Sequence, residues 1–223
     1  DAFAGRMKDS LQMICFSATI PDQLKPFLKR YMHQPKVIRI EDSGDEKAQI
    51  KHILIPCYHR PYAQTILQIL PGFQPYVCLI FANSRQEASG LAKELRKEHL
   101  AVTELHGDLS SRQRRQAMKQ LAAAQNTYVV ATDLAARGID VAEVTHVISC
   151  GFPKDLKYYI HRAGRTGRMH ADGVCYALYR DHDDAAIRSL MKQGIHFEHM
   201  RFHGGTWQVL RPFGQKHPEK DAE

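Results

Sequence analysis

The chain has 223 residues, which exceeds a typical single domain and falls short of two, so we expect one whole domain plus part of another. Hydrophobic residues make up 43% and charged residues 25%, a balance that excludes wholesale disorder. The formal net charge of +7 favours a polyanionic partner without identifying one. No apolar run reaches the length of a membrane span and no signal peptide opens the chain, so we expect a cytoplasmic protein without a membrane partner.

The amino-terminal part resembles the end of one domain followed by a linker. Ser17-Ala18-Thr19 follows a short apolar run, a helix is expected from Pro21 to about Tyr31, and residues 37–40 have the pattern of a strand. Residues 41–49 are polar and charged, without apolar periodicity. We therefore expect residues 1–40 to close a first domain and residues 41–49 to form an interdomain linker.

Beyond the linker, apolar strand patterns alternate with helical ones. Strands are expected at 50–56, 76–81, 102–105, 128–131, 144–149 and 174–179, and helices at 62–70, 85–97, 110–124, 156–161 and 183–193. This alternation predicts an α/β fold, a doubly wound parallel sheet with helices on both faces, over residues 50–202. Residues 203–223, rich in glycine, proline and charge, are expected to be a flexible tail.

Neither the cysteines nor the histidines predict a metal site. The cysteines at 15, 57, 78, 150 and 175 are scattered, without the spacing of metal or redox pairs, and we expect buried, reduced thiols. His196, His199 and His203 have no accompanying carboxylate or thiol pair, and imidazoles on an exposed strand are the favoured interpretation.

The block His161-Arg-Ala-Gly-Arg-Thr-Gly-Arg168 concentrates guanidinium groups in one segment. Three arginines recur every third residue, and Gly164 and Gly167 stand beside them. Glycine allows sharp backbone turns, so the segment should leave its preceding helix and present planar donors suited to phosphate oxygens. A surface cluster of salt-bridged arginines is the alternative for an isolated pattern of this kind.

A second block follows the expected strand at 128–131 directly and argues against that alternative. It is Ala131-Thr-Asp-Leu-Ala-Ala-Arg-Gly-Ile-Asp140, and the arginine-rich block lies about twenty residues further on. Ligands of open α/β sheets bind where strands end and loops gather. Two polar loops after neighbouring strands therefore indicate one shared site.

Together these segments resemble the DEAD-box helicase family. "SAT" at 17–19, "ATDLAARGID" at 131–140 and "HRAGRTGR" at 161–168 are similar to its motifs III, V and VI, in matching order and spacing. "FANS" at 81–84 resembles motif IV, and "HGD" at 106–108 resembles the turn before the motif IVa helix. The resemblance covers nearly the whole chain and implies the carboxy-terminal RecA-like domain, preceded by the end of the amino-terminal one.

The resemblance implies an ATP site shared with the first domain. Arg165 and Arg168 resemble arginine fingers that reach the γ-phosphate, and Asp140 resembles the carboxylate that binds the ribose, with Gly138 beside it. His161 is expected in the network that links the ATP and RNA sites. Fixed cations stabilise the charge that develops on a transferring phosphoryl group.

The resemblance also implies a groove for the RNA backbone. The RNA-contacting positions would be Asn83, Ser84, Gly107, Arg114, Thr132, Arg137 and Gly138. Arg114 matches the arginine of the family's Q-x-x-R contact, but Ser111 stands at the glutamine position, and Arg112 or Arg115 could compensate. Backbone contacts carry no base sequence, so the RNA target is not specified.

Several residues keep a structural alternative. Arg162 is expected more to anchor its own loop than to meet a ligand, and Asn83 and Ser84 could contact phosphate or cap the next helix. The basic helix after "HGD" could simply have solvated arginines. Ser17 and Thr19 would couple nucleotide state to strand separation in the whole enzyme, or cap the turn into their helix.

No G-x-x-x-x-G-K-[ST] loop and no D-E-A-D tetrapeptide occur in the sequence, so we expect this chain alone not to hydrolyse ATP. Mg²⁺ would accompany ATP through the missing first domain. The short linker and tail resemble the cold-shock-associated CshB type of bacterial DEAD-box protein, whose relatives act in ribosome assembly and RNA degradation. A non-catalytic adaptor with a helicase-like fold and a DNA-directed superfamily 2 lobe are the competing interpretations.

Overall fold

The computed structural model describes residues 14–15, 25–32, 34–38, 50–122, 128–136, 144–167 and 172–215. The chain divides into two compact units, Asp1–Asp45 and Glu46–Glu223. In the first unit, helix α1 spans Lys25–Tyr31, within the expected helix. Val37 and Ile38 belong to no strand, which corrects the first half of the strand expected at 37–40.

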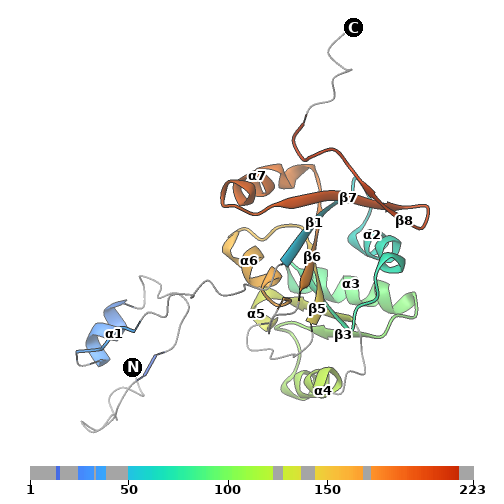
Figure 1. Cartoon of the computed structure of the whole chain (residues 1–223). Helices are drawn as coiled ribbons and strands as arrows, with labels where there is room; N and C mark the ends of the chain where they lie inside the picture. Colours follow the sequence, from blue (N-terminus) through green and yellow to red (C-terminus); the bar gives the residue numbers. More distant parts are fainter. Residues whose placement is uncertain are drawn as a thin grey trace. The chain divides into compact units, whose positions relative to one another are not determined.

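The second unit contains an eight-stranded sheet with the order β3-β4-β2-β5-β6-β1-β7-β8 (Figure 1). Its strands are β1 (Ile50–Pro56), β2 (Val77–Ala82), β3 (Val102–Leu105), β4 (Tyr128–Thr132), β5 (Val144–Cys150), β6 (Gly173–Tyr179), β7 (Phe197–His203) and β8 (Thr206–Val209). Its helices are α2 (Tyr62–Ile69), α3 (Arg85–Lys97), α4 (Ser111–Ala122), α5 (Asp133–Ala136), α6 (Lys157–Ala163) and α7 (Asp184–Lys192), with 3-10 turns η3 (Leu70–Gly72) and η4 (Asp181–Asp183). All strand pairs are parallel except β7 with β8, so the expected doubly wound α/β plan is confirmed.

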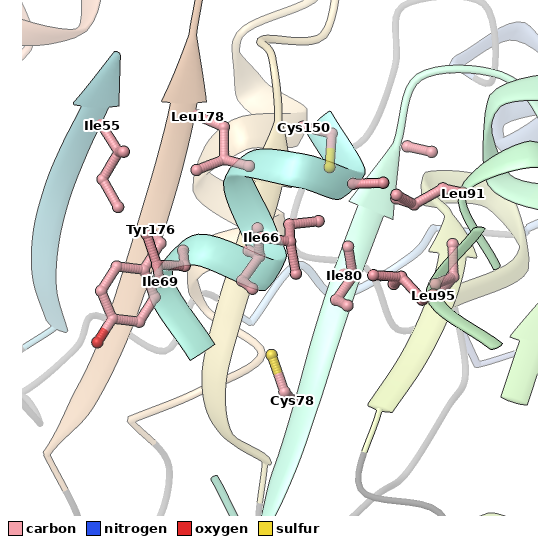
Figure 2. Packing of buried hydrophobic residues seen from close by; sticks show 14 of the residues in the cluster. Ile55, Ile66, Ile69, Cys78, Ile80, Leu91, Leu95, Cys150, Tyr176 and Leu178 are labelled. Carbon is pink, nitrogen blue, oxygen red and sulfur yellow. The ribbon is translucent and has the colours of Figure 1, made fainter. Parts of the chain in front are cut away.

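The sheet is covered on both faces because its central strands are apolar throughout. All six residues of β2 are buried, as expected for a parallel strand packed on both sides. On one face, α2 and α3 cover the sheet with residues such as Ile66, Ile69 and Leu95 (Figure 2). On the other face, α4, α5, α6 and α7 cover it with residues such as Tyr159 and Ile187. Full burial of one isoleucine side chain stabilises the folded state by about 1.5–3 kcal/mol.

The five cysteines are free thiols, and four of them are buried in this core. Cys15, in the first unit, is exposed, which corrects the expected burial of this thiol. Burial raises the pKa of Cys78 and Cys150, so these thiols stay protonated at neutral pH. No helix among the described residues is long and apolar enough to cross a membrane.

The expected flexible tail is corrected by the β7–β8 hairpin. Residues Thr206–Val209 pair antiparallel with β7 and extend the sheet beyond residue 202. The indole Nε1 of Trp207 donates to the carbonyl of Gly72 at 3.0 Å, and its ring stacks on Tyr176 at 5.6 Å. The sequence did not predict this short strand because Gly204 and Gly205, which form the hairpin turn, gave the segment the composition of a flexible tail.

The close packing of this hairpin against Gly72 predicts a steric clash for any side chain at that position. A Cβ atom there would lie 2.6 Å from Trp207 Nε1 and 2.8 Å from Phe202 Cε2. We expect Gly72→Ala to lower the free energy of unfolding by about 1–3 kcal/mol in urea titrations, through overpacking. Gly90→Ala is the matched control, since nothing lies within 4 Å of a Cβ at that helical position. Equal stabilities for both variants would contradict the docked hairpin.

A buried polar chain holds α6 against the sheet. His52 Nδ1 lies 2.9 Å from the hydroxyl of Tyr159, which also meets the Cys175 thiol at 3.9 Å. Burial lowers the pKa of His52 from its ordinary 6.5 to about 4, because the charged imidazolium would lose its hydration. The native state therefore prefers the neutral imidazole, and the unfolded state takes up a proton at higher pH.

This shift predicts an acid-dependent loss of stability. Since the folded pKa of His52 is depressed, its contribution is intact above the unfolded pKa of 6.5 and falls as the pH drops towards about 4. We expect the free energy of unfolding to fall by about 2 kcal/mol more in the parent than in His52→Asn between about pH 7.5 and about pH 5. The asparagine oxygen can replace Nδ1 without titrating. Parallel pH profiles for the two proteins would refute this assignment.

Candidate nucleotide and RNA site

Three neighbouring strands end together at the centre of the sheet. β4, β2 and β5 are adjacent, and each is followed by a polar segment. Asp133 comes after β4, Asn83 after β2, and Gly151 after β5. Parallel strands place their carboxyl ends at one edge, where open α/β sheets bind ligands. Asp133 of the "ATDLAARGID" block and Asn83 of "FANS" therefore lie at this edge, and α6, which begins the "HRAGRTGR" block, follows β5 along the chain.

The side chain of Arg162 joins all three strand ends. Its Nε and Nη2 atoms each donate to one carboxylate oxygen of Asp133 at 2.7 Å. Nη2 also donates to Asn83 Oδ1, and Nη1 to Ser149 Oγ, both at 2.8 Å. The guanidinium lies over the Phe81 ring, 5.4 Å from its centroid, and the residue is 1% exposed. This bidentate, fully enclosed arrangement fixes the relative positions of the three loops.

These contacts show which structural alternatives are present. Arg162 anchors its own loop, as the alternative interpretation expected. Asn83 uses both ends of its amide internally, because Oδ1 accepts from Arg162 and Nδ2 donates to the Cys150 carbonyl at 3.2 Å. Ser84 caps α3, since its hydroxyl accepts from the Glu87 amide at 3.1 Å. An RNA contact by Asn83 or Ser84 stays a prediction.

A small hollow lies beside the Arg162 network, and it contains two of the proposed ATP-site residues. Arg165 and His161 line it together with Tyr158 and Ala136. His161 is exposed at the end of α6, edge-on to the Tyr158 ring at 6.1 Å. The helix runs two residues further than expected and ends at Ala163, so Arg162 stays in it, buried, and the described segment leaves the helix only from Gly164 on. The hollow thus combines an aromatic wall with cationic and imidazole groups.

Gly167, a little further along that segment, needs its glycine. Its φ of 66° lies in the left-handed region, which side-chain-bearing residues adopt with strain. Thr166 precedes it, and its hydroxyl donates to the Thr145 carbonyl at 2.8 Å, which ties the turn to the start of β5. The glycine therefore allows the backbone conformation of this turn.

Three of the expected RNA-side residues, Thr132, Gly107 and Arg114, lie around the ends of β3 and β4. Thr132 is the partly exposed last residue of β4, and Gly107 occupies the turn after β3. Arg114, on α4, donates from Nη2 to the Ala135 carbonyl at 3.2 Å, so it holds α4 against α5. Ser111 is exposed at the start of α4. The structure brings these residues to the same edge as the Arg162 network.

Six of the residues proposed from sequence lie outside the described part of the chain. They are Ser17, Thr19, Arg137, Gly138, Asp140 and Arg168. Their roles stay predictions.

Asp133 and Ser149 are the functional partners that the sequence interpretation missed. Asp133 directly follows an apolar strand within the "ATDLAARGID" block, and a carboxylate there is the natural partner for a buried arginine. Within the described residues, no group of three histidine, cysteine or acidic side chains is arranged to hold a metal ion.

Comparison with known proteins agrees with this geometry. Residues 63–170 match the family model described as the helicase conserved C-terminal domain. The chain is 42% identical over 208 residues to the DEAD-box ATP-dependent RNA helicase CshB of Bacillus subtilis (strain 168), which covers 93% of this chain. This chain contains the C-terminal domain of a DEAD-box RNA helicase. The expected family and its CshB-like character are thereby confirmed.

Other relatives place the DEAD-box chain in the same group. CshB of Listeria monocytogenes serovar 1/2a is 40% identical over 90% of this chain. The solved structure of S. cerevisiae Dbp5 bound to RNA and ADP BeF3 superposes with a TM-score of 0.71, at 25% identity, and covers 86% of this chain and 52% of that one. The chain spans 48% of the B. subtilis relative and 46% of the Listeria relative, about half of each.

The Arg162 network predicts a large cost for a conservative substitution. Lysine keeps the charge but cannot donate to Asp133, Asn83 and Ser149 together, and it leaves the carboxylate without its planar partner. We expect Arg162→Lys to lower the free energy of unfolding by about 3–5 kcal/mol in urea titrations. Arg188→Lys, at an exposed pair with Asp184, should change it by less than about 1 kcal/mol. Similar losses of unfolding free energy in both variants would contradict a larger stabilising role for the Arg162 network than for an exposed ion pair.

Proposed function

We propose that this domain forms the second half of an ATP-dependent RNA helicase and that, in the whole protein, it supplies arginine fingers and half of the RNA groove. The observation that carries the proposal is the Arg162 network, which gathers the three motif-bearing loops beside the hollow lined by Arg165. The relatives named as ATP-dependent RNA helicases support it.

The residues at this edge suit triphosphate chemistry. Arg165 lies in the turn after α6, where a partly exposed guanidinium can meet phosphate oxygens. Arg168 would be the second finger, three residues on, and Asp140 would accept hydrogen bonds from the ribose beside Gly138. ATP bound between the two domains would supply the γ-phosphoryl group for hydrolysis, with Mg²⁺ held mainly by the first domain. One arginine finger contributes about 10³–10⁵ in rate.

The RNA side of the proposal depends on backbone donors and phosphate contacts. Thr132 and Gly107 lie at the ends of adjacent strands, and Arg137 and Gly138 follow α5 in sequence. Asn83, Ser84 and Arg114 would complete the groove, although each also has a structural contact. Contacts of this kind bind RNA without a strong preference for base sequence.

Coupling between the two sites would pass through the same rigid network. His161 and Arg162 lie on the same helix, α6. A displacement of His161 at the ATP site would therefore shift Arg162 and the strand ends that it joins on the RNA side. Ser17 and Thr19 would report nucleotide state from the first domain. Closure and reopening of the domains would then be a hinge motion at the linker. The chain by itself, without a Walker A or D-E-A-D segment, would be inactive as an ATPase.

Cellular context is proposed from the CshB relatives. We place the whole protein in the bacterial cytoplasm, with ribosome-assembly or RNA-degradation factors as partners and cold shock as a condition of use. A non-catalytic adaptor is disfavoured because Arg165, Arg168 and Asp140 are all present. Competition of single-stranded DNA against RNA would separate the DNA-directed alternative.

The decisive test uses the full-length natural protein. We expect RNA to stimulate its ATP hydrolysis and Arg168→Ala to lower the RNA-stimulated kcat by roughly 10³-fold or more, because the γ-phosphoryl charge loses a fixed cation. Lys192→Ala, at the exposed end of α7, is the matched control and should retain the parent rate.

Two results would overturn the proposal. Equal rates of ATP hydrolysis with and without RNA would contradict the assignment as an RNA-dependent ATPase. An unchanged rate in Arg168→Ala would contradict the assignment of Arg168 as an arginine finger. Either result favours the adaptor.

A further inference from the structure

Helix α4 carries an unbalanced positive charge that the proposed groove does not account for. Between Asp108 and Asp133 the sequence has four arginines and lysines and no acidic residue. Arg114 is used internally, at the Ala135 carbonyl. The others, Arg112, Arg115 and Lys119, are exposed and are called here the basic stripe. Among the described residues, no carboxylate forms an ion pair with any of them.

The helix geometry aligns the basic stripe on the outer face. Positions separated by three and four residues share one side of an α-helix, so the three cations form a row. The opposite side packs on the sheet through Ala117 and Leu121, which are buried. α4 lies beside β3, which is the edge strand at this end of the sheet in the described part of the chain (Figure 1).

A polar hollow runs next to the basic stripe, between α4 and β3. Gln113, Gln116 and Gln120 line it from α4, and Glu104, which forms an ion pair with Arg96, lines it from β3. The Gln113 side-chain oxygen accepts from the Ser110 amide, and the Gln120 oxygen accepts from the Thr103 hydroxyl. The side-chain N–H groups of Gln113 and Gln120 take no part in these two hydrogen bonds and can still donate. Cations beside amide donors suit phosphate and ribose oxygens better than an apolar partner.

The position of α4 connects this surface to the proposed RNA groove. Its first turn follows the "HGD" turn directly, and Arg114 fixes it to α5 after β4. From Arg112 to Lys119 the row extends about 10 Å along the helix, over which one nucleic-acid strand presents about three phosphates. RNA that leaves the groove past Gly107 would therefore meet the basic stripe.

We propose that the basic stripe binds the sugar-phosphate backbone of RNA outside the groove, as a second, purely electrostatic contact. This rests on the proposed function, because the groove must first hold RNA. By contrast, exposed Lys93 and Lys97 on α3 stand in a helix that also carries Glu87 and Glu94, which offset part of its positive charge. The positive charge on α4 therefore indicates a polyanionic partner.

The test measures RNA affinity of the full-length protein, with a non-hydrolysable ATP analogue, by fluorescence anisotropy across a KCl series. The variant is Arg112→Gln, Arg115→Gln and Lys119→Gln together, which keeps helix propensity and leaves Arg114 in place. The probes are a short oligonucleotide that just saturates ATP hydrolysis, the same oligonucleotide with a single-stranded extension, and the same with a hairpin duplex. Lys93→Gln with Lys97→Gln is the matched control.

We expect the triple variant to bind one or both extended probes roughly tenfold more weakly and to lower the log–log salt slope by about 2. The triple variant should lose less affinity for the short probe than for the extended probes, because Arg112 or Arg115 could also serve the groove contact. Lys119→Gln alone, like the control pair, should leave the short-probe affinity and the RNA-saturated kcat unchanged. The single-stranded and duplex probes distinguish which form of RNA the stripe holds.

Unchanged Kd and slope for both extended probes would overturn the inference while leaving the groove intact. Equal losses on short and extended probes would also overturn it, because the cations would then belong to the groove. Binding of polyglutamate that the triple variant loses, with RNA unaffected, would assign the stripe to an acidic protein instead. Absence of RNA-stimulated ATP hydrolysis in the parent would be a failure of the proposed function, seen before any variant is made.

Discussion

A buried guanidinium is the constraint on which the rest of the site depends. Burying a charge costs several kcal/mol unless it is paired and fully hydrogen-bonded. Arg162 meets this condition only when the ends of β4, β2 and β5 lie together, because its partners come from all three. Any displacement of one strand end would leave either the arginine or Asp133 without its partner. The ion pair therefore selects one arrangement of the loops.

The Arg162 network gives the residues that are proposed to contact ligands a rigid support. Of the described side chains proposed to meet ATP, His161 lies on α6 and Arg165 in the turn after it, and both line a hollow beside the buried Arg162. The surrounding sheet is covered on both faces by apolar helices, and Tyr159 ties α6 to β1 through His52. Precise positioning of this kind is what electrostatic stabilisation of a phosphoryl group requires.

The two ends of the sheet are closed in different ways. At one end, the β7–β8 hairpin adds antiparallel strands and seats Trp207 against the turn after α2. At the other end, β3 is short, and α4 leaves a basic face towards solvent. Short strands and charged neighbours discourage edge-to-edge pairing, so the α4 end keeps its surface available for a polyanion.

The sequence by itself determined the parallel α/β plan and the family. Periodicity and turn residues are local signals, so they were sufficient for these conclusions. The sequence also led us to expect that the two chemical blocks follow neighbouring strands, whereas β2 separates β4 from β5 and the arginine-rich block begins within α6. Only the tertiary structure decided that Arg162 bonds Asp133, Asn83 and Ser149, since these contacts cross 13 to 79 positions of sequence. It also decided that residues 206–209 form a strand, because Trp207 is stabilised by Gly72 and Tyr176 rather than by its own neighbours. Packing between distant segments leaves no periodic trace in the sequence.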